Sequence, residues 1–261
     1  MAKTKTIVAQ SDITAGQMED FWRKVKDGTI SGSCLDSFLR NPSRFNPISL
    51  TLVRATRILG SGKVLSTEQA TKAWGLPNPG ETLIRYSEED LREAAEENKT
   101  GADWRLVYFS GQSLREQHAK RGDNPESQPC FYKSWDWWLK SKEDEWANRK
   151  PVPGYYLLDF RGRFGRTSWD RQNEEIVKLG SNFERTHEAV VTEAAMSFFM
   201  TTGERLLGDF YHWGPSETSN GLRVRVGCFD ENGWCVGSYR NPGYVGSDSS
   251  LRVCLSRKFR S

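Results

Sequence analysis

The chain has 261 residues, which is enough to bury a core and to form one large domain or two small ones. Its 37 basic and 34 acidic residues give a formal net charge of +3 and are interspersed along most of the chain, so the charge gives no argument for a nucleic-acid partner. No stretch is apolar enough for a membrane span. Ten Trp, thirteen Phe and eight Tyr indicate either a strongly buttressed core or a recognition surface.

The five cysteines, at positions 34, 130, 228, 235 and 254, are odd in number and scattered. No pair has C-x-x-C spacing, so the sequence indicates neither a zinc site nor a redox pair. The first residues contain no apolar stretch that could act as a secretory signal, and we expect a soluble protein, cytoplasmic by default. We therefore expect Cys34 and Cys130 to form no disulfide. Display on a virion or a cell surface stays open.

Residues 1–100 predict a mainly helical N-terminal region of unknown role. Met18 and Trp22 belong to an amphipathic pattern that predicts a helix ending near Gly28. Residues 35–39 predict a second short helix.

Two further helices are expected before residue 101. Thr67 is the expected cap of a brief helix that reaches Trp74. Ser87 and Asp90 form a capping box, in which each side chain binds the backbone N–H of the other residue, and this predicts an acidic helix over 88–98.

Strands and helices alternate after residue 101. Residues 105–109 and 155–160 predict strands, and residues 131–146 predict a helix with several Trp side chains on one side. A helix is expected from about 168 to 180. Another, from 184 to about 201, has an apolar face so wide that it indicates a buried helix.

After Gly203 the helical periodicity disappears. Residues 222–226 alternate strictly between apolar and polar, as a half-buried strand does, and 233–237 and 251–255 predict two more short strands. The loops between them are rich in Gly, Ser, Asn, Asp and Tyr. The order of elements predicts an α+β fold.

Known catalytic patterns are absent from the sequence. His187 and Glu188 begin like a zinc-peptidase helix motif, but Val191 stands where the second His is needed. Residues 57–64 resemble a phosphate loop that lacks its first Gly and its final Ser or Thr. There is no nucleophile elbow and no dinucleotide-binding fingerprint. We expect no catalytic residue, no metal site and no cofactor.

The C-terminal region resembles a known fold family. Trp213 lies in an aromatic-rich segment that leads into a strand ending in Val-Gly-Cys-Phe at 226–229, and after a loop with an Arg the region closes on a strand at 250–255. This order resembles the end of the C-type lectin fold in formylglycine-generating-enzyme-like domains. The resemblance implies such a domain over 101–261, with the strand at 105–109 close to the last strand. Gly-Cys-Phe replaces the family's Gly-Gly-Ser-Trp.

More narrowly, the layout is similar to the variable proteins of diversity-generating retroelements. In that family, adenine-directed mutagenesis of Asn-type codons diversifies a C-terminal region, here about 210–250, and does not produce Trp, Lys, Glu, Gln or Met. Residues 238–250 contain only residue types that this process allows. Tyr, Ser, Gly, Asn and Arg are also the residues that antibody-like surfaces favour.

This resemblance divides the side chains of the C-terminal region into two groups. We predict that the strand residues of the first group are buried: Trp213, Val224, Val226, Trp234, Val236, Val253 and Leu255. We predict that the ligand-binding residues are largely exposed and gather on one face: Tyr211, His212, Ser219, Asn220, Arg225, Phe229, Asp230, Asn232, Tyr239, Arg240, Asn241, Tyr244 and Asp248.

The resemblance implies a non-catalytic recognition protein with a protein or cell-surface ligand. Two other classes stay open. A formylglycine-generating-type oxidase would need Cys228, Cys235 or Cys254, yet the sequence places no base or cation beside them. A basic module could stack nucleic-acid bases on its aromatic residues, but no concentrated Lys/Arg stripe supports it, and we expect no nucleic-acid partner. The oligomeric state does not follow from the sequence.

Overall fold

The computed structural model describes residues 15–33, 35–36, 50–80, 82–140, 145–239 and 250–259. The chain forms two compact units, Met1–Ile48 and Ser49–Ser261. In the first unit, the predicted helix is present as α1 (Ala15–Lys26), and its Met18 and Trp22 are exposed. The second helix expected there, over 35–39, falls mostly outside the described residues.

The division between the units differs from the expected boundary near residue 100. Three helices that precede residue 100 belong to the second unit: α4 (Leu52–Leu59), α5 (Thr67–Ala73) and α6 (Glu88–Lys99). Ala55 of α4 and Leu91 of α6 are fully buried in one core with Trp104. These helices therefore complete the core of the sheet.

Local capping explains where two of these helices begin. The capping box between Ser87 and Asp90 is present at the start of α6, as predicted. Helix α5 also begins with a capping box, but its cap is Ser66, whose side chain pairs with Gln69, and not Thr67.

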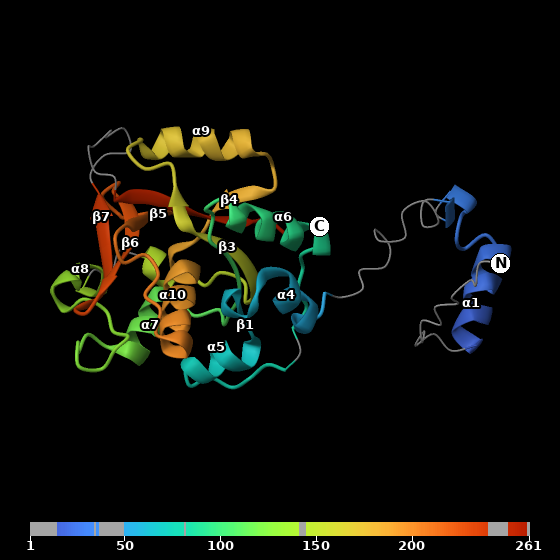
Figure 1. The fold of residues 1–261 in the computed structure, drawn as a ribbon, viewed down its shortest axis with the longest axis horizontal. Helices are drawn as coiled ribbons and strands as arrows, with labels where there is room; N and C mark the ends of the chain where they lie inside the picture. Colours follow the sequence, from blue (N-terminus) through green and yellow to red (C-terminus); the bar gives the residue numbers. More distant parts are fainter. Residues whose placement is uncertain are drawn as a thin grey trace. The chain divides into compact units, whose positions relative to one another are not determined.

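The second unit contains an open, eight-stranded mixed sheet, so the fold is α+β as predicted (Figure 1). The strand order is β1-β2-β3-β8-β5-β6-β7, and β4 pairs with β8 beside this path. The strands are β1 (Val64–Leu65), β2 (Trp104–Phe109), β3 (Gly154–Arg163), β4 (Phe183–Arg185), β5 (Tyr211–Glu217), β6 (Arg223–Asp230), β7 (Gly233–Tyr239) and β8 (Leu251–Arg257).

Strand β8 joins the two halves of the sheet. Its first residues, Leu251 and Arg252, pair in parallel with β5, whereas Leu255 and Ser256 pair antiparallel with both β3 and β4. The strand at 105–109 and the last strand were predicted to lie close together. They lie in one sheet but do not pair directly, because β3 lies between β2 and β8 and pairs with both.

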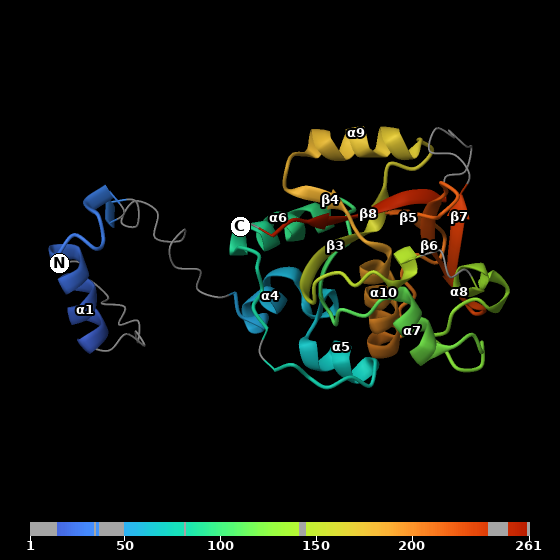
Figure 2. The same cartoon turned by 180° about the vertical axis from the view of Figure 1, so that it is seen from behind.

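Helices cover both sides of the central strands (Figure 2). Val107 of β2 and Leu158 of β3 face one hydrophobic core, whereas their neighbours Leu106 and Leu157 face a second core on the opposite side. Helices α4, α6 and α9 (Trp169–Leu179) contribute to the second core. Ser168 caps α9 and Gly180 ends it, as predicted.

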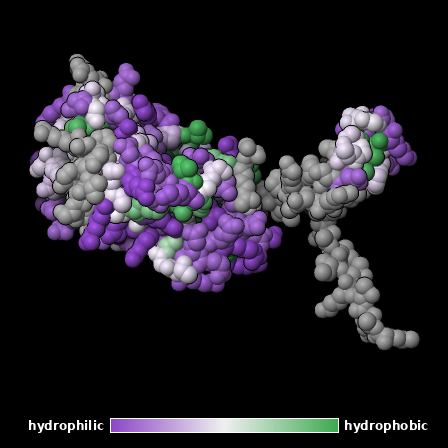
Figure 3. Space-filling view, turned by 90° about the horizontal axis from the view of Figure 1, so that it is seen from above, coloured by the Kyte–Doolittle hydropathy of each residue, from purple (hydrophilic) through white to green (hydrophobic). Residues whose placement is uncertain are grey.

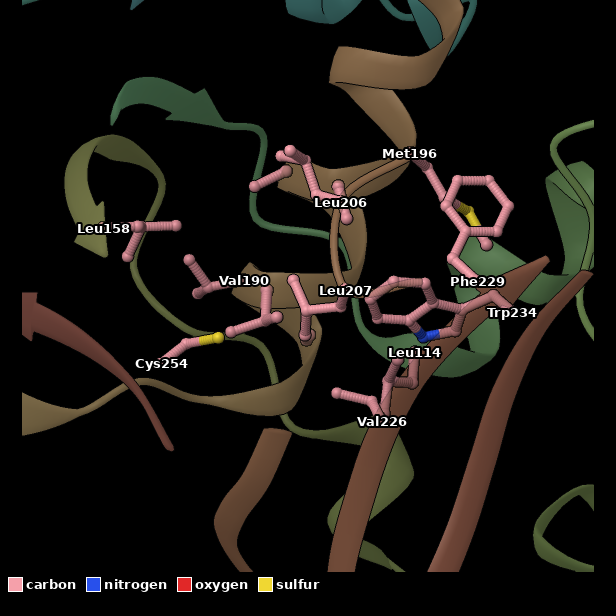
Figure 4. Packing of buried hydrophobic residues seen from close by; sticks show 14 of the residues in the cluster. Leu114, Leu158, Val190, Met196, Leu206, Leu207, Val226, Phe229, Trp234 and Cys254 are labelled. Atoms are coloured by element: carbon pink, nitrogen blue, oxygen red, sulfur yellow. The ribbon is translucent and has the colours of Figure 1, made fainter. Parts of the chain in front are cut away.

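Helix α10 (Glu188–Thr202) fills the first core, which Figure 4 shows in detail. Val190 and Met196 pack there with Leu158 of β3 and with Val226 and Trp234 from the C-terminal strands. The helix was predicted to start at Glu184. It starts at Glu188, because residues 183–185 form β4 and pair with β8.

The predicted helix over 131–146 is wrong. The described residues form a 3-10 turn at Lys133–Trp135, one helical turn α8 (Trp137–Lys140) and a 3-10 turn at Glu145–Asn148. Helix α7 (Leu114–Arg121) precedes this segment. Trp138 and Trp146 are buried, whereas Trp135 is half-buried, so these side chains do not share the single helix face that their spacing suggested.

The surface of the second unit is mainly hydrophilic in the view from above, and its hydrophobic residues form small separate patches (Figure 3). Among the described residues, no helix is long and apolar enough to cross a membrane.

Candidate binding surface

The C-terminal strands β5, β6, β7 and β8 bury the side chains that were predicted to support them. All seven are at most 1% exposed: Trp213, Val224, Val226, Trp234, Val236, Val253 and Leu255. Val224, Val226 and Val236 belong to the core around α10. This part of the prediction is confirmed.

We call the side of β5, β6 and β7 opposite Val224, Val226 and Val236 the outer face. Trp213 pairs with Arg225 and lies on this side as well, where it is fully buried. Arg225 lies between Val224 and Val226 on β6 and points to the opposite side of the sheet, as the alternation predicted, but it is half-buried and not largely exposed. Arg225 pairs with Gly237 of β7, and Tyr211 of β5 pairs with Gly227 two residues further along β6. Side chains of paired residues share a side of the sheet, so Arg225 and Tyr211 lie on the same face.

Three side chains form a compact cluster on the outer face, named the outer patch. The rings of Trp135 and Tyr211 are nearly parallel, with 6.1 Å between their centroids and 6° between their planes. The guanidinium carbon of Arg225 lies 4.2 Å from the centroid of Tyr211 and 5.4 Å from that of Trp135. Such cation–π contacts fix the side chains relative to one another. All three are half-buried.

Trp135 reaches the sheet from a distant part of the chain. The segment before it runs beside β7: the backbone N–H of Tyr132 donates to the carbonyl of Trp234, and the N–H of Trp234 donates to that of Cys130. A side chain at Gly237 would meet the Trp135 ring at 2.8 Å, so the indole lies directly on the strand. The sequence predicted Trp135 to be one of the Trp side chains on one side of a helix over 131–146, and its contact with the sheet was missed. A glycine inside a strand, which often marks a close approach, was the available signal.

A second aromatic side chain, Trp169, packs against the other end of the outer face. Trp169, at the start of α9, donates through its indole N–H to the carbonyl of Gly214 at 3.0 Å. The guanidinium carbons of Arg223 and Arg185 lie 3.9 and 4.8 Å from the centroid of its ring. Arg223 also forms an ion pair with Glu217 at 3.0 Å. These contacts hold α9 against the strands.

Two predicted ligand-binding residues are buried, so their predicted exposure is wrong. His212 pairs with Val226, and its side chain points away from the outer face. On that buried side, its ring forms hydrogen bonds with the backbone of Thr186 and of Cys254. Phe229 follows an irregularity in β6: Cys228 has a φ of 46°, and the register with β7 shifts between Gly227 and Asp230. This bulge breaks the alternation and turns Phe229 into the core.

The predicted ligand-binding residues at the turns do not form one group, and Asp230 is half-buried whereas the other three are exposed. Ser219 and Asn220 lie in the turn before β6, and Asp230 and Asn232 lie at the turn after it. The eight residues of β6 separate these turns by roughly 23 Å. Only the turn at Asp230 is near Tyr211, because Tyr211 pairs with Gly227.

Five predicted ligand-binding residues cannot be placed. Arg240, Asn241, Tyr244 and Asp248 lie outside the described residues, and Tyr239 is described only as the last residue of β7. Their role stays a prediction.

Two cysteines lie beside the outer patch. The Tyr211 hydroxyl lies close to the thiols of Cys228 and Cys235 and interacts with both. Burial raises the pKa of Cys228, and it raises that of Cys235 to about 12. Both groups are therefore thiols at neutral pH and weak nucleophiles. Cys254 is fully buried, and burial raises its pKa as well.

Cys130 also has a free thiol, whereas Cys34 is not described. In the part of the chain that is described, no three His, Cys, Asp or Glu side chains are arranged to hold a metal ion.

Comparison with known proteins finds no matching family model, no similar curated protein and no similar solved structure.

Proposed function

We propose that the chain is a non-catalytic recognition protein, in which residues 211–250 form a diversified ligand-binding surface on a C-type lectin-like scaffold. The observation that carries this proposal is the separation of roles along β6. Val224 and Val226 are fully buried, whereas Arg225 between them belongs to the half-exposed outer patch. Substitutions cost several kcal/mol in a core but about 0.5 kcal/mol on a surface, so this separation lets a surface change without unfolding the protein.

The composition of the outer patch favours a protein ligand. Trp, Tyr and Arg are the residue types that most often contribute strongly to binding in protein interfaces. Tyr211 and Arg225 are held by stacking on Trp135, so little side-chain entropy is lost when a partner binds. We therefore propose that the ligand is a protein, free or on a cell surface, and that Trp135 is a constant anchor beside the diversified residues.

The arrangement of the sheet supports the C-type lectin-like scaffold. That fold brings its first and last strands together, and here β2, the first strand after residue 101, and β8 both pair with β3. The diversified connection, 240–249, joins β7 to β8, and both of these strands are paired within the sheet.

The DNA around the gene tests diversification directly. We expect a reverse transcriptase gene nearby, together with a near-copy of the DNA that encodes residues 210–255 and that differs from it at adenines. A complete neighbourhood without such a repeat would overturn the retroelement proposal.

One observation favours a second candidate, the formylglycine-generating-type oxidase. Cys228 and Cys235 come together at the Tyr211 hydroxyl, although they are seven positions apart in the chain. The full chain should be incubated with a cysteine-containing peptide in air, and the peptide should be analysed for an aldehyde by mass spectrometry. We expect none. Aldehyde formation that is lost in Cys228→Ser would show an oxidase and overturn the non-catalytic proposal.

A further inference from the structure

A small, partly open cavity lies beside the outer patch, and Trp135 contributes to both. The buried rings of Phe131, Trp138 and Trp234 line it. Its free space is that of one water-sized group.

The aromatic rings around the cavity are held in place by one another. The centroids of Phe131 and Trp138 are 5.8 Å apart. The ring of His118 is perpendicular to Trp138 at 5.6 Å and lies 5.2 Å from Phe131. Tyr132 and Trp135 meet edge to face at 6.2 Å. A cavity with such walls keeps its size when it is empty.

Two carboxylates give the cavity a negative potential. Asp123 and Asp136 both line it, and the negative charge of each favours the protonated form of the His118 ring. Asp136 pairs with the exposed Lys140 at 2.8 Å. Among the described residues, none forms a hydrogen bond or an ion pair with the Asp123 side chain, which is half-buried.

Lys140 is paired with Asp136, and the guanidinium of Arg115 donates to the carbonyls of Trp138 and Leu139 at the cavity wall, so the negative potential at the cavity comes mainly from Asp123. Burial lowers the pKa of His118, so its ring is neutral at pH 7. Lys133 also lines the cavity, but its side chain is exposed and free to extend into solvent.

We propose that this cavity binds a primary ammonium group, such as the end of a lysine side chain. Aromatic faces attract a cation, and a carboxylate forms a charge-assisted hydrogen bond with it. A primary ammonium has three donors and the size of a water molecule, whereas a quaternary ammonium is too large for the free space. The inference goes beyond the proposed function and does not require it, because the cavity exists whether or not the outer patch binds a protein.

A titration of the full chain with methylammonium chloride tests this proposal. Backbone and indole N–H signals are followed by two-dimensional NMR at constant ionic strength, with sodium chloride and tetramethylammonium chloride as matched salts. We expect saturable shifts for the residues that line the cavity with methylammonium only. We also expect them with Nα-acetyl-lysine amide and not with its Nε-trimethylated form.

Variants show whether the carboxylate is responsible. Asp123→Asn should weaken methylammonium binding by about fivefold or more, whereas Glu126→Gln, a change at an exposed carboxylate in the same loop, should leave it unchanged. The proposal is overturned if methylammonium gives no saturable shift, which means that the cavity holds water only. Equal binding of tetramethylammonium, or unchanged binding by a folded Asp123→Asn variant, would also overturn it.

Discussion

The backbone N–H of Cys254 in β8 donates a hydrogen bond to Nδ1 of His212 in β5 over 2.9 Å. Because Nδ1 is an acceptor, the proton of the neutral ring is on Nε2, which donates to the carbonyl of Thr186 at 2.8 Å. One buried imidazole thus connects the strand β5, the last strand and the residues just before α10.

We predict that His212→Ala destabilises the protein, because it leaves a buried N–H and a buried carbonyl without partners. The free energy of unfolding, measured in urea, should fall by about 2–5 kcal/mol. Asn232→Ala, at an exposed turn, is the matched control and should change it by about 0.5 kcal/mol or less. A value for His212→Ala as small as that of the control would contradict the structural role.

The same histidine makes stability depend on pH. Burial lowers the pKa of His212 from 6.5 to about 3. The unfolded chain therefore binds a proton below pH 6.5 that the folded chain rejects, and the contribution of His212 to stability is lost as the pH falls from 6.5 towards 3. Unfolding free energies of the wild type between pH 7 and pH 5 should show this loss, and His212→Ala should show less of it.

A buried carboxyl has the opposite effect. Glu193 in α10 accepts hydrogen bonds from the backbone and hydroxyl of Ser110, and burial raises its pKa from 4.5 to about 7. The folded state holds a proton that the unfolded state releases, so the contribution of this carboxyl is complete below pH 4.5 and is lost as the pH rises through 7.

We therefore predict that Glu193→Gln stabilises the protein at pH 8 relative to pH 5. The difference in unfolding free energy between variant and wild type should be more favourable to the variant at pH 8, by about 1–3 kcal/mol. The matched control is Glu126→Gln, at an exposed carboxylate. Equal differences at both pH values would show that Glu193 ionises normally.

Gly214 is required because no other side chain fits there. A Cβ atom at this position would overlap the carboxylate of Glu188, which accepts hydrogen bonds from the backbone and hydroxyl of Ser216 at 2.8 and 3.0 Å. We predict that Gly214→Ala costs about 3 kcal/mol of unfolding free energy. Gly208→Ala is the control, because its Cβ would lie 3.6 Å from the nearest atom, and thermal unfolding of the two variants should separate them clearly.

The display surface itself is tested by a combined substitution. We expect that replacing Tyr239, Arg240, Asn241 and Tyr244 together with alanine changes the melting temperature by less than about 4 °C, since surface side chains contribute little to folding. Val226→Ala, in the core, should lower it more. A loss of stability by the combined variant equal to that of Val226→Ala would mean that these side chains hold the fold together.

The sequence correctly predicts the structural features that depend only on residues close together in the chain. The capping box of Ser87 and Asp90 and the alternation around Arg225 depend on contacts within a few positions, and both are present. The strand β5 was missed because Gly214 and Pro215 interrupt its pattern, and its pairing is made with β6 and β8.

Long-range contacts decide the rest. Trp135, Trp138 and Trp146 have helical spacing, yet Trp138 and Trp146 contact each other in the core whereas Trp135 stacks on Tyr211 of β5, and their segment folds into short turns. No local signal shows that His212 binds Thr186 and Cys254, which are 26 and 42 positions away. The bulge at Cys228, which buries Phe229, likewise depends on the register with β7.

The two ends of the connection between β7 and β8 are set by backbone pairing. Tyr239 pairs with Arg223, and the carbonyl of Ser250 accepts a hydrogen bond from the N–H of Tyr211 at 2.6 Å. The entropic cost of closing a chain between fixed ends grows only with the logarithm of its length, so doubling the number of residues between them costs about 0.6 kcal/mol. This region can therefore tolerate insertions and deletions as well as point substitutions. Related chains can differ here in length while β7 keeps its register with β6 and β8 keeps its register with β5.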